Sequence, residues 1–131
     1  MTVSLLVITH DSIGQSLVDT ANTMLGVTPL HIDVLGVSRT TNPDDARIQA
    51  EKLIENNTST LVLTDMYGST PSNIACHLRE LENVRIVSGL NLPMLVRVLN
   101  YPKLDLNELV NKALTGGQDG VLTCHKDSAH G

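Results

Sequence analysis

The chain of 131 residues contains no phenylalanine, no tryptophan and only two tyrosines. Its hydrophobic core must therefore be built from leucine, valine and isoleucine, which favours aliphatic strands and helices packed in layers, as in an α/β protein. A chain of this length suits one domain with a single core. We expect that domain to span residues 1–124 and a polar C-terminal tail to follow over residues 125–131.

Clustered positive charge is missing as well. The chain has 9 Lys and Arg against 14 Asp and Glu, which gives a net charge of −5. We expect no nucleic-acid partner, because a phosphate-binding surface needs basic residues gathered together. No apolar run approaches the roughly 18–20 residues of a membrane span, and the N-terminus lacks the features of a signal peptide. These absences predict a cytoplasmic protein.

Cysteine is scarce, and the two that are present, Cys76 and Cys124, form no Cys-x-x-Cys motif. We expect free, buried thiols in preference to a disulfide or a metal-binding pair. In the tail, Cys124, His125 and His130 lack a closed set of ligands for a zinc site. We therefore expect no metal and no other cofactor.

Short apolar runs alternate with helical patterns along the chain. The runs are mostly apolar on both faces, as in parallel strands that helices cover on both sides. The expected strands are residues 3–9, 30–35, 60–64 and 84–88, with 120–124 as a short further candidate. The expected helices are one ended by Gly26, one begun by Asn42, one with Thr70 as N-cap, one over residues 91–99 and one ended by Gly116-Gly117.

This order predicts a doubly wound, mostly parallel sheet of strand order 2-1-3-4 with helices on both faces. Residues 120–124 would add an antiparallel edge strand. Because Gly116-Gly117 is a flexible pair, this strand could join the sheet of a second copy and give a swapped homodimer. The alternative is that it folds back on its own sheet and leaves a monomer.

A histidine and an aspartate stand where two of the expected strands end. His10 follows the first strand and Asp65 follows the third. In the order 2-1-3-4 these strands are neighbours, and ligands bind beyond the carboxyl ends of such strands. A carboxylate bonded to one ring nitrogen fixes the tautomer and leaves the other nitrogen as a nucleophile that can accept a phosphoryl group.

Small polar residues could stabilise that group. Gly68, Ser69 and Thr70 precede an expected helix, whose N-terminus offers free N–H groups and a favourable dipole. Ser12 could donate its hydroxyl from the start of the first helix. Each residue also has a simpler interpretation, with His10 as a surface residue, Asp65 as a turn former and Thr70 as a helix cap. Only their convergence favours a site.

Three segments carry a resemblance to a known family: VITHDSIGQSLVDTANTMLG, LVLTDMYGSTPSNIA and VSGLNLPML. With them, residues 2–123 resemble the IIA domain of the mannose–sorbose family of the bacterial sugar phosphotransferase system. The resemblance implies that His10 is phosphorylated, that Asp65 orients it and that the Thr70 hydroxyl lies close to the phosphoryl group. It also implies phospho-HPr as donor, a IIB component as acceptor, peripheral association with membrane IIC and IID components, and a homodimer.

The chain departs from the family pattern at Asp11, Ser69 and Ser72. Relatives often have Ser or Gly after the histidine, and the extra negative charge of Asp11 could slow phosphorylation. Two other roles stay open. One is a regulatory module whose His10 phosphorylation is read by a protein partner. The sequence supports it modestly, because no IIB segment follows residue 131, but a IIB component on a separate chain explains this equally well. The other is the IIA-like subunit of dihydroxyacetone kinase.

Overall fold

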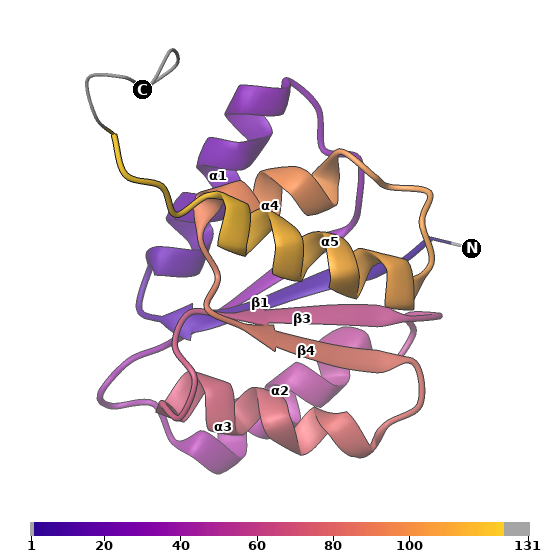
Figure 1. Cartoon of the computed structure of the whole chain (residues 1–131). Coiled ribbons are helices and arrows are strands. Elements are labelled where there is room, and N and C mark those ends of the chain that lie inside the picture. Colours follow the sequence, from indigo (N-terminus) through magenta and orange to yellow (C-terminus); the bar gives the residue numbers. More distant parts are fainter. Residues whose placement is uncertain (1, 125–131) are drawn as a thin grey trace.

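The computed structural model describes residues 2–124 as four strands and their connecting helices (Figure 1). The sheet is entirely parallel with the order β2-β1-β3-β4, which confirms the predicted doubly wound topology. The expected tail, residues 125–131, lies outside the described residues. The elements are β1 (Ser4–His10), α1 (Ile13–Leu25), β2 (Ile32–Val37), α2 (Pro43–Ile54), β3 (Thr60–Thr64), α3 (Thr70–Cys76), the 3-10 helix η1 (His77–Glu80), β4 (Val84–Ser88), α4 (Leu92–Leu99) and α5 (Leu106–Asp119).

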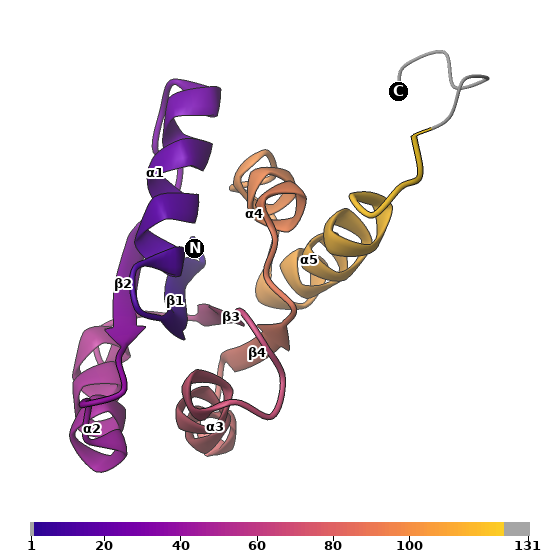
Figure 2. The same cartoon turned by 90° about the vertical axis from the view of Figure 1, so that its left-hand side faces the viewer.

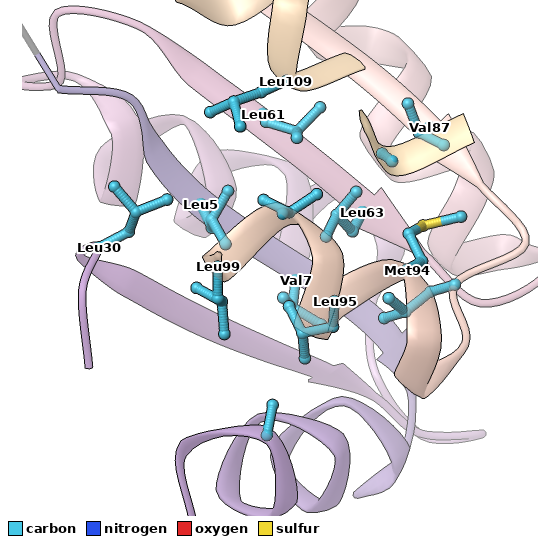
Figure 3. Close-up of a cluster of buried hydrophobic side chains, with 14 of the residues drawn as sticks. Leu5, Val7, Leu30, Leu61, Leu63, Val87, Met94, Leu95, Leu99 and Leu109 are labelled. Atoms are coloured by element: carbon cyan, nitrogen blue, oxygen red, sulfur yellow. The ribbon is translucent and has the colours of Figure 1, made fainter. Parts of the chain in front are cut away.

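Helices cover both faces of the sheet. Figures 1 and 2 show α1, α4 and α5 over one face and α2 and α3 over the other. Alternate side chains of β1 enter the two layers, with Leu5 and Val7 on one side and Leu6 and Ile8 on the other. In the first layer they meet Leu95 and Leu99 of α4, among other aliphatic side chains (Figure 3). The core is thus aliphatic in both layers, as the composition predicts.

The predicted strand bounds are right for β3 and β4 and shifted for the other two. β1 runs one residue further than expected, so His10 is its last residue and pairs with Val37. β2 begins two residues later than expected and ends two residues later, at Val37. Leu30 precedes the strand and is nevertheless buried in the core. The shift places His10 inside the sheet ladder, which fixes its backbone.

The helical spacing of Ile13, Leu17, Ala21, Met24 and Leu25 predicts the buried face of α1, and this prediction is partly wrong. The buried residues of α1 are Gly14, Val18 and Ala21, whereas Ile13 and Met24 are exposed. The helix ends as expected at Gly26, whose φ of 73° is in the left-handed region that glycine tolerates.

The predicted end of α5 is also wrong. Gly116 and Gly117 lie inside the helix and are buried, and α5 continues to Asp119. A Cβ on Gly116 would lie 2.7 Å from the Cβ of Arg97, and one on Gly117 would lie 2.8 Å from the Cε of Met94. These glycines allow α5 to pack closely on α4; they are not a flexible hinge.

The segment after α5 forms no strand in the single chain. Residues 121–124 are exposed and have no regular structure, so the predicted edge strand is not seen here. Both cysteines are free, but Cys76 is only partly buried and Cys124 is exposed, so the expectation of buried thiols is wrong. None of the helices between residues 2 and 124 has the length and apolar character needed to cross a lipid bilayer.

Ser72 of α3 is buried, at 1% exposure, and its hydroxyl has no hydrogen-bond partner among residues 2–124. Because an unsatisfied buried hydroxyl costs about 1–3 kcal/mol, we expect Ser72→Ala to raise the free energy of unfolding by about 1 kcal/mol. Urea denaturation measures this change. Ser69→Ala is the matched control with the opposite sign, because the Ser69 hydroxyl donates a hydrogen bond to the Met66 carbonyl oxygen. A destabilised Ser72→Ala protein would contradict the prediction.

Candidate functional site

His10 and Asp65 lie at the switch point of the sheet. From β1 the chain proceeds to β2 on one side, and β3 lies on the other, so the strand order reverses between β1 and β3. Ile8 of β1 pairs with Thr64, the last residue of β3. His10 lies two residues beyond this pair and Asp65 lies one residue beyond it. The two side chains therefore meet at the edge where ligands bind in parallel sheets.

One oxygen of Asp65 holds both the ring and the backbone of His10. Asp65 Oδ2 accepts from Nδ1 of the ring at 2.7 Å and from the backbone N–H of His10 at 3.1 Å. The other oxygen, Oδ1, accepts from the backbone N–H of Met66 at 3.1 Å. A carboxylate is only an acceptor, so Nδ1 carries the proton in this arrangement. Nε2 then keeps its lone pair and is the nucleophilic atom of the ring.

The two partners differ in exposure and therefore in the chemistry open to them. The His10 side chain is 41% exposed, whereas that of Asp65 is 12% exposed. Burial by itself raises the pKa of Asp65, but the side-chain and backbone hydrogen bonds from His10 outweigh burial and leave that pKa below its ordinary value of 3.8. Asp65 is thus a carboxylate at neutral pH, and it orients the ring without taking its proton.

Thr9 fixes the turn that follows His10, a role that was not predicted from the sequence. It is fully buried, and its hydroxyl oxygen accepts from the backbone N–H of Gly14 at 2.7 Å. The same hydroxyl donates to the carbonyl oxygen of His10 at 3.2 Å. A polar residue at the end of an otherwise apolar strand was the available signal.

The segment after β3 places the predicted phosphoryl-stabilising residues near the same edge. Gly68 adopts a φ of 82°, which favours glycine. The N-cap of α3 is Ser69, not Thr70 as predicted, and its hydroxyl donates to the Met66 carbonyl oxygen at 2.6 Å. Thr70 is the first residue of α3 and is exposed. No hydrogen bond within residues 2–124 joins any of the three to His10.

Ser12 is the N-cap of α1, and its side chain makes no capping hydrogen bond. It is exposed, two residues after His10. Its hydroxyl makes no hydrogen bond to His10. The position matches the prediction for a donor at the start of this helix, and the role of the residue stays a prediction.

The loop after β4 is tied to β3 at the same edge. The backbone N–H of Leu90 donates to the Thr64 carbonyl oxygen at 2.9 Å. Asn91, expected as the first residue of the helix, is instead its N-cap, with its Oδ1 accepting from the N–H of Met94. Its Nδ2 also donates to the Gly117 carbonyl oxygen at 3.1 Å, which joins the start of α4 to the last turn of α5.

A second histidine–aspartate pair lies at the opposite end of the sheet. His31 Nε2 lies 2.9 Å from Asp33 Oδ2, but the His31 side chain is 62% exposed and the pair lies at the start of the edge strand β2. Across residues 2–124, no three His, Cys, Asp or Glu side chains gather in a way that could hold a metal ion.

Known proteins with similar sequences are sugar phosphotransferase components. The family model EIIA-man, described as "PTS system fructose IIA component", matches residues 4–114. The chain is 32% identical over 129 residues to the PTS system mannose-specific EIIAB component of Escherichia coli, with 92% of this chain and 39% of that protein covered. It thus spans about two fifths of the length of the curated relatives it matches.

Solved structures share the fold. The mannose/sorbose specific IIA subunit of Enterococcus faecalis superposes with a TM-score of 0.88 at 22% identity, and the match covers 98% of each chain. A PTS IIA protein associated with the fucose utilization operon of Streptococcus pneumoniae gives a TM-score of 0.75 at 27% identity, with 94% of this chain and 93% of that one covered.

Proposed function

The chain belongs to the EIIA-man family of sugar phosphotransferase components, and from this premise we propose that it carries a phosphoryl group on His10. The group would come from phospho-HPr and pass to a IIB component. One observation supports this most directly. The ring of His10 is partly exposed, and its Nδ1 is bound to Asp65, so that Nε2 remains free as the acceptor atom.

The transfer step balances without a cofactor. The Nε2 lone pair of His10 forms a bond to phosphorus while the bond from phosphorus to the donor's leaving atom breaks, and the donor keeps that electron pair. The proton on Nδ1 remains in the hydrogen bond to Asp65, which compensates the positive charge that the phosphorylated ring carries. Such transfer depends mainly on positioning and on stabilising charge.

We assign the stabilising role to Gly68, Ser69, Thr70 and Ser12. Thr70 and Ser12 are exposed, and each begins or caps a helix beside the edge that carries His10. Their hydroxyls could donate to phosphoryl oxygens, and backbone N–H groups at these turns could do the same. Ser69 would first have to turn its hydroxyl away from Met66.

We also propose the setting in which this chemistry occurs. The acidic chain, with its net charge of −5, suits a donor with a basic docking face, because opposite charges raise the association rate. The protein would act in the cytoplasm as a homodimer and would associate peripherally with membrane IIC and IID components while it serves the IIB acceptor.

The experiment is incubation with phosphoenolpyruvate, enzyme I and HPr, followed by intact-mass measurement. We expect a mass gain of one phosphoryl group that is lost in acid and kept in base, as phosphohistidine requires. Omitting HPr is the control. No mass gain would overturn the proposal, whereas a labelled protein that passes nothing to IIB would leave the regulatory role in its place.

Asp65→Asn is expected to slow transfer by roughly 10- to 100-fold without abolishing it, because the reacting ring loses its fixed orientation. The amide can still hold the ring through one hydrogen bond, but it stabilises positive charge poorly and can favour the wrong tautomer. The rate of mass gain measures the effect. Asp33→Asn, at the exposed pair on β2, is the matched control and should transfer normally. A wild-type rate for Asp65→Asn would make Asp65 only a turn residue.

A further inference from the structure

Gly36 of β2 has no side chain at a point where the backbone of another segment lies against it. It pairs with Thr9 in the sheet, and Thr9 faces the same side as Leu5 and Val7, toward α1. The chain leaves β1 on that side and runs directly over Gly36. A Cβ on Gly36 would lie only 2.4 Å from the carbonyl oxygen of Asp11.

Conformational freedom does not explain this glycine. The glycines with positive φ are Gly26, Gly68 and Gly89, and Gly36 is not among them. In a regular strand, glycine costs stability because it packs no side chain, and it often marks a close approach of backbone. The close approach of the Asp11 carbonyl oxygen is therefore the reason that the position requires glycine.

Asp11 itself is held in an unusual conformation. Its φ is 43°, in the left-handed region that residues with a side chain seldom adopt. Its backbone N–H donates to the Val37 carbonyl oxygen at 3.0 Å, which extends the β1–β2 pairing by one residue beyond His10. Strained conformations of this kind persist where the surroundings over-determine them.

We propose that Gly36 is a positioning residue for His10. By leaving room for the Asp11 carbonyl, it lets the chain turn tightly over β2, and this turn fixes the backbone of His10 where Asp65 Oδ2 can accept from both its N–H and its Nδ1. The expected effect of Gly36 on phosphoryl transfer rests on the proposed function. Its expected effect on the geometry of His10 does not.

A side chain at position 36 cannot be accommodated by a rotamer change, because the atom it meets belongs to the backbone. Either β2 moves away from β1 or the turn at Asp11 moves. Both shifts displace His10, since the Val37 carbonyl lies next to Gly36 and the Asp11 amide next to His10. Asp65 keeps its place, because it follows β3 on the other side of β1.

The test is Gly36→Ala, read first by the ¹⁵N NMR shifts of the His10 ring at a fixed pH. We expect the Nδ1 signal to lose the character of a hydrogen-bonded N–H and the tautomers to mix. Phosphorylation by phospho-HPr should then slow on the order of 10- to 100-fold, the loss expected for a reacting group misplaced by about 1 Å. Unchanged ring shifts in a folded Gly36→Ala protein would overturn the inference, whatever the transfer rate.

Gly26→Ala is the matched control. It also replaces an exposed glycine and also destabilises, because Gly26 has a φ of 73°, but it lies at the far end of α1 with open space around it. It should lower the melting temperature and leave the His10 ring shifts and labelling rate unchanged. If it perturbs both as Gly36→Ala does, a general loss of stability explains the result and the inference falls.

A second variant covers the case in which Gly36→Ala does not fold. In the double variant Asp11→Gly with Gly36→Ala, the glycine at position 11 lets the peptide turn its carbonyl away from the new methyl group. This protein should fold, and its His10 ring shifts should match those of the single variant Asp11→Gly, in which Gly36 is intact. If the double variant does not fold, or if its ring shifts differ from those of Asp11→Gly, the contact with the Asp11 carbonyl is not the cause. Failure of the wild-type protein to accept phosphate would refute the proposed function and leave these NMR outcomes intact.

Discussion

His10→Ala is expected to abolish phosphorylation completely while the protein stays folded. The variant lacks the only atom proposed to bind the phosphoryl group, so no partial activity should remain. The fold should survive because Asp65 Oδ2 still accepts from the backbone N–H of residue 10, and the ring itself is 41% exposed. Substitutions at such positions usually change stability by within about 0.5 kcal/mol. Circular dichroism and intact mass after incubation with phosphoenolpyruvate, enzyme I and HPr test both halves of the prediction.

His31→Ala is the matched control for this experiment. His31 also hydrogen-bonds to an aspartate, but it lies at the opposite end of the sheet from His10. Its removal should leave labelling unchanged. Retained labelling in folded His10→Ala, lost on further removal of His31, would move the carrier role to the second pair and contradict the assignment of His10.

The strands β3 and β4 and the strand order were predictable because they follow from local patterns of apolar residues. β3 and β4 have the bounds predicted for them. β3 is buried at every residue, and β4 buries Val84 and Val87 although Arg85 is exposed. The strand order followed from the alternation of strands and helices, and it brought His10 and Asp65 together. Their contact was therefore predictable from the topology, although the sequence could not show that one oxygen of Asp65 accepts both hydrogen bonds.

Glycines that serve packing between elements distant in sequence were the least predictable feature. Gly116 and Gly117 looked like a helix stop, but they are buried against Arg97 and Met94 of α4. The role of Gly36 was not predicted, because it depends on contact with the Asp11 carbonyl, 25 positions earlier in the chain. A sequence shows that a glycine is present, and only the tertiary structure shows whether it serves a turn or a close contact.

The end of α5 at Asp119 defines the segment that could join two copies in a dimer. Residues 120–124 form a C-terminal arm that begins where the helix ends. Its Val121 and Leu122 are 76% and 85% exposed in the single chain. Figures 1 and 2 show residues 121–124 leading away from the helices. Apolar side chains on an extended segment gain free energy when a surface covers them.

A suitable surface lies along β4. This strand ends the sheet, and within residues 2–124 no strand pairs with its outer edge. A hollow beside it is lined by residues that include Tyr67, Ile86, Val110 and Leu114. An unpaired edge is a template for strand addition. We therefore expect residues 120–124 of one copy to add to β4 of another as an antiparallel strand, in a symmetric exchange.

Sedimentation of the full-length protein should then give a mass of roughly twice the 14.1 kDa of the chain. Leu122→Asp would place a charge in the interface and should weaken the dimer by roughly 30-fold or more, as loss of a 2 kcal/mol contact does. A chain ending at Gly120 should weaken it further, and this end point keeps the hydrogen bond from Asn91 to the Gly117 carbonyl. Met24→Asp, at an exposed residue of α1, is the matched control and should leave the mass unchanged. A full-length protein that sediments as a monomer at micromolar concentration would refute the exchange, because the exchange requires the arm of one copy to pair with β4 of another.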